Sequence, residues 1–296
     1  METERRLLRL ADGRDIEFQT AGQADGLALV VHEGTPMGLV LNTNLAIAAG
    51  ERGLRIVQVA RPGYEGSTPR PGRTVADVVP DVIAVLDALG AGEFVSIGFS
   101  GGGPHTLACA ALAPGRCLGT ASVAGVAPYT ADGLDFLAGM GPENVEEFSL
   151  AARGADALTP FLDKEVESLR RITGEQIVAS LGGLISAADA AVLTGDFAAD
   201  LAVGLSGAVR NGIAGWRDDD LAFVADWGFP LDALSGRAAI WQGDQDNMVP
   251  FAHGRWLAAH IADAHAHLEP GAGHLTMTVT AIDLILDDLL DLAARG

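Results

Sequence analysis

The sequence predicts an α/β fold, in which helices flank a mostly parallel central sheet and a helical segment is inserted into the core. Short apolar runs of strand length alternate with stretches of helical periodicity, and this alternation indicates strand-helix-strand units. The runs cover residues 27–32, 54–59, 94–98, 118–124 and 237–242. The alternation breaks after residue 124 and returns near residue 237, which indicates the insertion.

The first elements form a predicted β-hairpin. Residues 6–10 and 15–19 flank Asp12-Gly13, and Asp-Gly is a strong turn signal. We therefore expect the sheet to begin with an antiparallel pair, a combination that mixed sheets often show.

A capping signal predicts a helix that runs toward Leu89. Thr74 and Asp77 have the spacing of a capping box, and Gly90 supplies the C-terminal signal. Pro80 would either delay the start of this helix or kink its first turns, because a proline past the first turn removes a backbone hydrogen bond.

The remaining elements divide the chain into two parts. Residues 265–269 read as a short strand, and apolar residues at helical spacing predict a helix over residues 275–294. The insertion shows no strand pattern and holds helical segments around residues 144–153, 161–172, 174–181, 197–208 and 218–226. We therefore expect a core formed by residues 1–127 and 229–296, and a helical insertion over residues 128–228.

Composition excludes several classes of partner. The 39 acidic and 19 basic residues give a net charge of −20, so nucleic acid and anionic membranes would be repelled. Residues 1–10 do not resemble a signal peptide, and no run is long and apolar enough to span a membrane. Cys109 and Cys117 lack metal-ligand neighbours and suit reduced core thiols. We expect a cytoplasmic protein with no nucleic-acid or membrane partner, and the sequence carries no signal of oligomeric state.

The pattern Gly-x-Ser-x-Gly occupies residues 98–102, between a predicted strand and a predicted helix. A tight strand-to-helix turn of this kind, a nucleophile elbow, exposes the hydroxyl of Ser100 at a helix N-terminus, where free amides favour developing negative charge. The short pattern alone is weak, and an ordinary tight turn is the alternative. Its position, and an aspartate and a histidine downstream in the right order, favour the catalytic interpretation.

A serine hydroxyl becomes a good nucleophile only when a nearby base takes its proton and a carboxylate orients that base. His274 is the predicted base, because it lies in a glycine-rich loop between the last strand and the last helix. Asp244 and Asp246 both follow the strand that ends at Gly243, and either could be the acid. The amide of Gly101, directly after the serine, is expected to contribute to an oxyanion hole.

These segments together resemble the α/β-hydrolase fold superfamily, and in particular its serine hydrolases with a helical cap. The resemblance implies that Asp246 is the acid, because the family places it three residues after the strand-ending glycine and shortly before Val-Pro. Residues 31–36 resemble the family's His-Gly-x-Pro loop, which implies that Thr35 supplies the second oxyanion amide; Glu33 is an extra residue in this loop. Residues 60–67 resemble a structural Arg-Pro-Gly-Tyr turn of the family.

The resemblance also implies a reaction. A serine nucleophile excludes the alkyl-ester chemistry of dehalogenases and epoxide hydrolases, which use an aspartate, and favours hydrolysis of a carboxylic ester, thioester or lactone without cofactor or metal. The insertion would form a lid over a neutral, fairly apolar small-molecule substrate, given its large apolar residues Phe136, Met140, Phe148, Phe161, Phe197, Trp216 and Phe223. Alternatives are a cofactor-free perhydrolase, C–C hydrolase or lyase using the same residues, or a small-molecule receptor that retains them.

Overall fold

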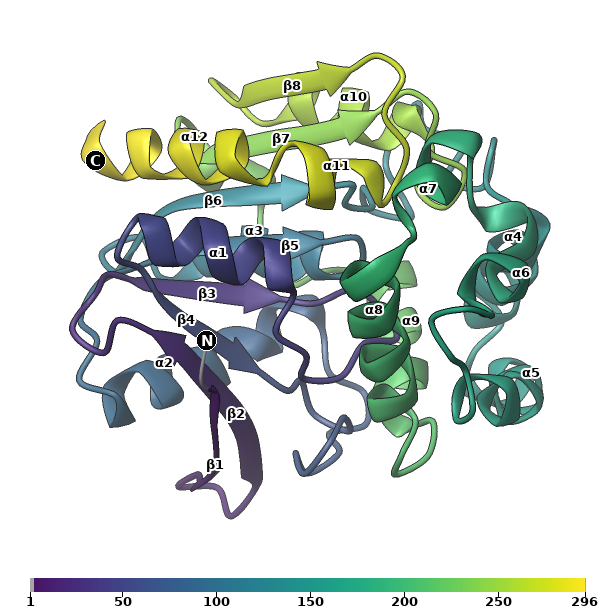
Figure 1. Ribbon diagram of the computed structural model, residues 1–296, viewed down its shortest axis with the longest axis horizontal. Coiled ribbons are helices and arrows are strands. Elements are labelled where there is room, and N and C mark those ends of the chain that lie inside the picture. Colours follow the sequence, from purple (N-terminus) through teal and green to yellow (C-terminus); the bar gives the residue numbers. More distant parts are fainter. Residues whose placement is uncertain (1–2, 296) are drawn as a thin grey trace.

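The computed structural model describes residues 3–295, and within that range one sheet of eight strands forms the centre of the molecule (Figure 1). The strand order is β1-β2-β4-β3-β5-β6-β7-β8, and among these described strands β2 alone runs opposite to the others. This arrangement confirms the predicted α/β class with a mostly parallel sheet. The strands are β1 Thr3–Arg9, β2 Asp15–Gly22, β3 Ala28–His32, β4 Arg55–Val59, β5 Phe94–Phe99, β6 Cys117–Val123, β7 Ala238–Gly243 and β8 His265–Glu269.

The central strands are apolar because helices cover both faces of the sheet. In β3, Val30 packs into the hydrophobic cluster on one face, whereas Leu29 and Val31 pack into the cluster on the other, as the alternation of side chains along a strand requires. The helices α1 and α12 cover one face, and α2, α3 and α10 cover the other (Figure 1). Their bounds are α1 Thr43–Glu51, α2 Val78–Ala88, α3 Gly102–Leu112, α10 Phe251–His260 and α12 Ile282–Arg295.

The predicted hairpin and the predicted capping box are both present. β1 pairs with β2 around Gly13, which has a left-handed φ of 86°. The amide of Thr74 donates to the carboxylate of Asp77 at 2.8 Å. A short 3₁₀ turn, Val75–Asp77, precedes α2, so Pro80 lies in the first turn of the α-helix and does not kink it.

The prediction of one continuous helix over residues 275–294 is wrong. The structure has a short helix α11, Thr276–Thr280, and then α12, with Ala281 outside the helical conformation between them. Met277 and Ile282 both pack into the same cluster against the sheet. Residues five apart in one continuous helix would point in different directions, so the break allows both to be buried.

Between β6 and β7 the described chain forms helices and no strand, and this segment is called the insertion below. These helices lie beyond the arrowheads of β3, β5, β6 and β7, at the right of Figure 1, where the carboxyl ends of the parallel strands meet. None of the described helices has the length and hydrophobicity needed to cross a membrane. The main helices of the insertion are α4 Pro142–Ala151, α5 Ala155–Leu169, α6 Ile177–Leu181, α7 Ala187–Val192, α8 Gly195–Ala208 and α9 Ala214–Val224.

Candidate active site

Ser100 lies in a strained turn between β5 and α3. Its φ of 53° is left-handed, a conformation that residues with a Cβ rarely adopt. Two backbone hydrogen bonds hold the turn: the Ser100 amide donates to the Val123 carbonyl at 2.9 Å, and the Gly103 amide donates to the Ser100 carbonyl at 2.8 Å. The turn therefore holds the serine side chain at the carboxyl edge of the sheet.

The two outer glycines of the pattern are required by close approach of backbone to backbone. A Cβ on Gly98 would lie 2.1 Å from the carbonyl oxygen of Gly102, and a Cβ on Gly102 would lie 2.1 Å from the carbonyl oxygen of His32. Neither neighbour is a flexible side chain that could move away. The spacing Gly-x-Ser-x-Gly is thus a consequence of how tightly the strand turns into the helix.

His274 lies in the loop between β8 and α11, and Asp246 lies in the loop after β7. The Nδ1 atom of His274 is 2.8 Å from Oδ2 of Asp246, and both side chains are buried. Burial alone would lower the pKa of His274, but the Asp246 carboxylate beside it raises that pKa, and the net direction is upward. Nε2 of His274 has no hydrogen-bond partner among residues 3–295, so it is free to accept a proton.

Hydrogen bonds fix the orientation of the Asp246 carboxylate. Oδ1 accepts from the amides of Met248 and Val249, both at 2.8 Å, and Oδ2 accepts from Nε2 of Gln242 at 2.9 Å as well as bonding His274. The second candidate acid, Asp244, is exposed and accepts from the amide of Gly271 at 2.8 Å and from the Gln245 side chain at 3.0 Å. The structure therefore brings Asp246, and not Asp244, to the imidazole.

Ser100 and His274 line one cavity of about 450 Å³, between the carboxyl edge of the sheet and the insertion. Its walls include Phe161, Phe197 and Trp216 from the expected set of apolar residues. The other four residues of that set do not line the cavity and instead pack into the hydrophobic cluster that includes α2, α3 and α10: Phe136, Met140, Phe148 and Phe223. The cavity is large enough for a small organic molecule.

Carboxyl groups also line this cavity. Glu146 and Glu165 of the insertion lie on its wall, and Lys164 is the basic residue there. Glu33, the extra residue in the loop after β3, faces the same space, and burial raises its pKa to about 7. The wall therefore combines apolar surface with several carboxyl groups, and burial opposes the charge of Glu33 among them.

Thr35 and Gly101 lie against each other beside Ser100. A Cβ on Gly101 would lie 2.5 Å from Oγ1 of Thr35, and a Cβ on Gly34 would lie 3.5 Å from Cβ of Ser100. Within the described chain, neither the Thr35 amide nor the Gly101 amide donates a hydrogen bond to another residue. Both amides are therefore available to an oxygen bound next to Ser100.

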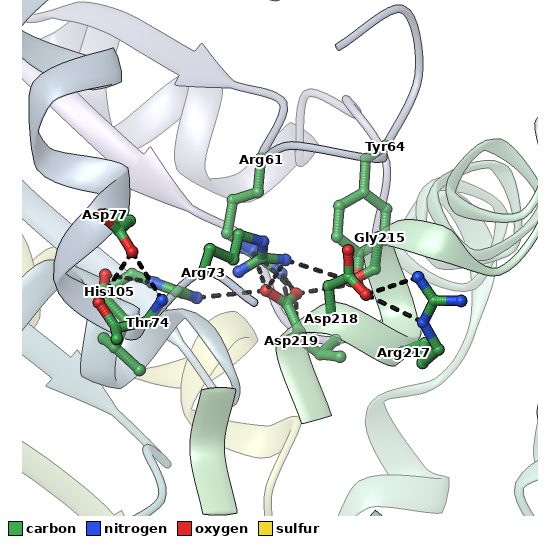
Figure 2. A network of polar contacts seen from close by, with 12 residues as sticks. Arg61, Tyr64, Arg73, Thr74, Asp77, His105, Gly215, Arg217, Asp218 and Asp219 are labelled. Carbon is green, nitrogen blue, oxygen red and sulfur yellow. Dashed lines mark hydrogen bonds and ion pairs between the residues drawn. The ribbon is translucent and has the colours of Figure 1, made fainter. Parts of the chain in front are cut away.

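A buried network centred on Asp219 of α9 supports the loop that carries Thr35. Figure 2 shows Arg61 and Arg73 directed at this carboxylate, and each makes a 2.6 Å contact with it. The hydroxyls of Tyr64 and Thr35 also donate to it, both at 2.8 Å. Although burial would raise the pKa of Asp219, the two arginines hold it well below its usual range, so the carboxylate is charged.

Arg61 connects this network to the backbone of the loop. Its guanidinium donates to the carbonyl of Glu33 at 2.7 Å and to that of Gly34 at 2.8 Å. His105 lies 3.4 Å from Asp219, but burial lowers its pKa to about 4, so it is neutral at physiological pH. The turn at residues 60–67 therefore has a structural task, which is to hold the loop after β3.

Two residues of this region were not identified from the sequence. Asp219 lies in a run of three acidic residues, all of them buried on α9. The sequence signal that could have identified it is Arg61, because a buried arginine needs a buried counter-charge. Asp189 of α7 accepts hydrogen bonds from the loop of His274. The spacing Ser186-x-x-Asp189 marks it as part of a capping box, but nothing in the sequence points to the loop of His274.

Comparison with known proteins gives consistent results. Residues 28–279 match the model of a family described as alpha/beta hydrolase fold. A non-heme chloroperoxidase from Streptomyces lividans is 30% identical over 155 residues, 52% of this chain and 56% of that protein, so the chain spans about half the length of this curated relative.

Among solved structures, an alpha/beta hydrolase fold protein from Nakamurella multipartita is 25% identical with a TM-score of 0.68, over 99% of this chain and 100% of that one. A thermophilic esterase from Thermogutta terrifontis is 18% identical with a TM-score of 0.66, over 98% and 99%. An enol-lactonase from Burkholderia xenovorans is 18% identical with a TM-score of 0.63, over 97% and 100%. The last two similarities concern the fold alone.

Proposed function

Because the chain belongs to the alpha/beta hydrolase fold family, we propose that it is a hydrolase that cleaves a carboxylic ester, thioester or lactone through an acyl-enzyme on Ser100. The observation that carries the proposal is the 2.8 Å bond between His274 Nδ1 and Asp246, made on the wall of the cavity that also exposes Ser100. Nucleophilic acyl transfer requires an exposed serine hydroxyl and a histidine base whose imidazole is oriented by a carboxylate.

In the first half of the reaction, Oγ of Ser100 attacks the substrate carbonyl while Nε2 of His274 takes the hydroxyl proton. Asp246 keeps the imidazole in the tautomer with hydrogen on Nδ1 and stabilises the imidazolium cation. The negative oxygen of the tetrahedral intermediate accepts hydrogen bonds from the amides of Gly101 and Thr35. When the C–O bond to the leaving group (C–S in a thioester) breaks, His274 gives its proton to the departing oxygen or sulfur.

In the second half, water replaces the alcohol. His274 takes a proton from the water while the water oxygen attacks the acyl carbon, and a second tetrahedral intermediate forms. When the ester bond between the acyl group and Ser100 breaks, His274 gives that proton to Oγ of Ser100. An ester gives a carboxylic acid and an alcohol, a thioester gives a carboxylic acid and a thiol, and a lactone gives a single hydroxy acid.

The cavity favours neutral or cationic substrates over anionic ones. Phe161, Phe197 and Trp216 offer apolar surface. Glu146 and Glu165 on the same wall would repel a carboxylate or phosphate on the substrate. We expect p-nitrophenyl butyrate to have a higher kcat/KM than the p-nitrophenyl monoester of succinate, which has a similar length and one negative charge. Equal or better turnover of the charged ester would contradict this assignment.

A fluorophosphonate probe tests the nucleophile directly. The wild-type protein should be labelled, and mass spectrometry should find the label on the peptide that contains Ser100. Ser100→Ala should lose both labelling and esterase activity, while the surface variant Ser206→Ala, on α8, should keep both. Unchanged turnover in Ser100→Ala, with circular dichroism showing a folded protein, would refute the proposal.

Perhydrolysis is the second candidate, because the 30% identity to a non-heme chloroperoxidase covers 52% of this chain. Hydrogen peroxide would then attack the acyl-enzyme in place of water and release a peracid. Peracid-dependent bromination of monochlorodimedone, measured with acetate and hydrogen peroxide, distinguishes the two reactions. Bromination in the wild type that disappears in Ser100→Ala would favour perhydrolysis over simple ester hydrolysis.

A further inference from the structure

The carboxylate of Asp189 binds the loop that carries His274. It lies on α7 of the insertion, and its exposure is 0%. Oδ2 accepts from the His274 amide at 3.0 Å, and Oδ1 accepts from the Leu275 amide at 2.7 Å. Oδ1 also accepts from the amide and from the hydroxyl of Thr276, both at 3.0 Å. One side chain thus binds three successive backbone amides, beginning with that of the candidate base.

This contact replaces a local helix cap. The three amides lie at the start of α11, where a helix leaves N–H groups without partners, and capping groups usually come from the chain just before the helix. Here the cap comes from a residue 85 positions away. A Cβ on Gly273 would lie 2.4 Å from each carboxylate oxygen of Asp189, so the loop could not approach this closely with any larger residue.

The carboxylate is itself held in place and charged. The hydroxyl of Ser186 donates to Oδ2 at 2.9 Å, and the Asp189 amide donates back to that hydroxyl at 3.2 Å. Burial would raise the pKa of Asp189, but the hydrogen bond from the Leu275 amide and its other donors lower it, so the side chain is ionised. The charged groups that act on the His274 imidazole are Asp246, in direct contact, and Asp189 behind the loop.

We propose that Asp189 is a positioning residue for the catalytic base, through which the insertion sets the place of the His274 imidazole relative to Ser100. The inference rests on the proposed function for the role of His274 and goes beyond it by assigning a task to α7. It implies that α7 and the base loop move as one unit, so that this edge of the insertion is a fixed part of the catalytic centre.

Asp189→Asn tests the proposal, because it keeps the volume but turns an NH₂ group toward backbone amides that need an acceptor. We expect kcat for p-nitrophenyl butyrate to fall about 10- to 100-fold with KM within about threefold, since small displacements of a catalytic group have effects of this size. We also expect the apparent pKa of the rate profile to fall, because a negative charge near the imidazole is removed.

The matched control is Asp77→Asn, which removes the charge of an aspartate that also accepts a backbone amide at the start of a helix but does not line the cavity. It should leave kcat and the pH profile unchanged. Ser186→Ala is the milder second variant, since it removes only the hydroxyl that orients Asp189, and it should shift kcat and the pH profile in the same direction by less.

NMR titration of the His274 imidazole in the wild type and the two variants gives the same test without a substrate. A wild-type kcat and pKa in folded Asp189→Asn, or in Ser186→Ala should Asp189→Asn not fold, would overturn the proposal. A wild-type protein that is neither labelled by fluorophosphonate nor active on esters would refute the proposed function instead, and a lowered His274 pKa in the variants would still support the contact with Asp189.

Discussion

Replacing Asp246 by asparagine should reduce kcat by up to about 10⁴, and the structure gives the reason. The amides of Met248 and Val249 both donate to Oδ1, so the amide oxygen of the asparagine is expected to stay there. Its NH₂ group would then face two donors, Nδ1–H of His274 and Nε2–H of Gln242, at the place where Oδ2 now accepts both.

The imidazole avoids the clash of donors by adopting the tautomer with hydrogen on Nε2. In that tautomer Nε2 cannot accept the proton of Ser100, so His274 no longer acts as the base. Loss of a hydrogen bond to a charged group costs about 1.5–3 kcal/mol by itself. The wrong tautomer adds to this loss, and the equivalent substitution in serine proteases lowers kcat by about 10⁴. Residual activity should come from Ser100 and the two oxyanion amides.

The assay is steady-state hydrolysis of p-nitrophenyl butyrate near pH 7, with circular dichroism to show that each variant is folded. Asp244→Asn is the matched control, because Asp244 lies two residues away in the same loop, is exposed, and makes no contact with His274. It should cost less than about tenfold, since it acts on the site only through screened fields. A large loss of kcat in Asp244→Asn together with a nearly unchanged kcat in Asp246→Asn would refute the reasoning.

Two further predictions concern charge. The neutral form of His274 is the base, and Asp246 raises the pKa of its imidazole. Activity should therefore be lost as pH falls through an apparent pKa above the usual histidine value of about 6.5. A flat kcat profile from pH 5 to 8 would contradict this role. Asp219→Ala leaves the buried Arg61 and Arg73 without their counter-charge. The free energy of unfolding, measured by urea denaturation, should therefore fall by about 3–5 kcal/mol, and a loss below about 1 kcal/mol would show that the network contributes little to stability.

Local chain constraints made part of the site predictable from sequence. The elbow around Ser100 is recognisable because backbone contacts at Gly98 and Gly102 exclude any side chain at those positions. The strands are recognisable because both faces of the sheet are covered, which leaves short apolar runs. His274 stands out because its glycine-rich loop lies between the last strand and the last helices.

Other features depended on packing between distant segments. The break at Ala281 appears only when Met277 and Ile282 are both placed against the sheet. The aromatic residues of the insertion look alike in the sequence, yet Phe161 lines the cavity and Phe136 packs into the hydrophobic cluster that includes α2, α3 and α10. A helical pattern indicates that a face is apolar, but it does not indicate which surface that face meets.

The sequence by itself determined the fold class, the serine at the elbow and the histidine that serves as candidate base, because short-range sterics and hydrophobic periodicity leave their pattern in neighbouring residues. The residues alone left both Asp244 and Asp246 open as the acid, and the turn that directs a carboxylate at His274 is visible only in three dimensions. Asp219 lies 158 positions from Arg61, and Asp189 lies 85 positions from His274. Such contacts were decided by the tertiary structure, because a buried charge is satisfied by whichever partner the fold brings to it, at any distance along the chain.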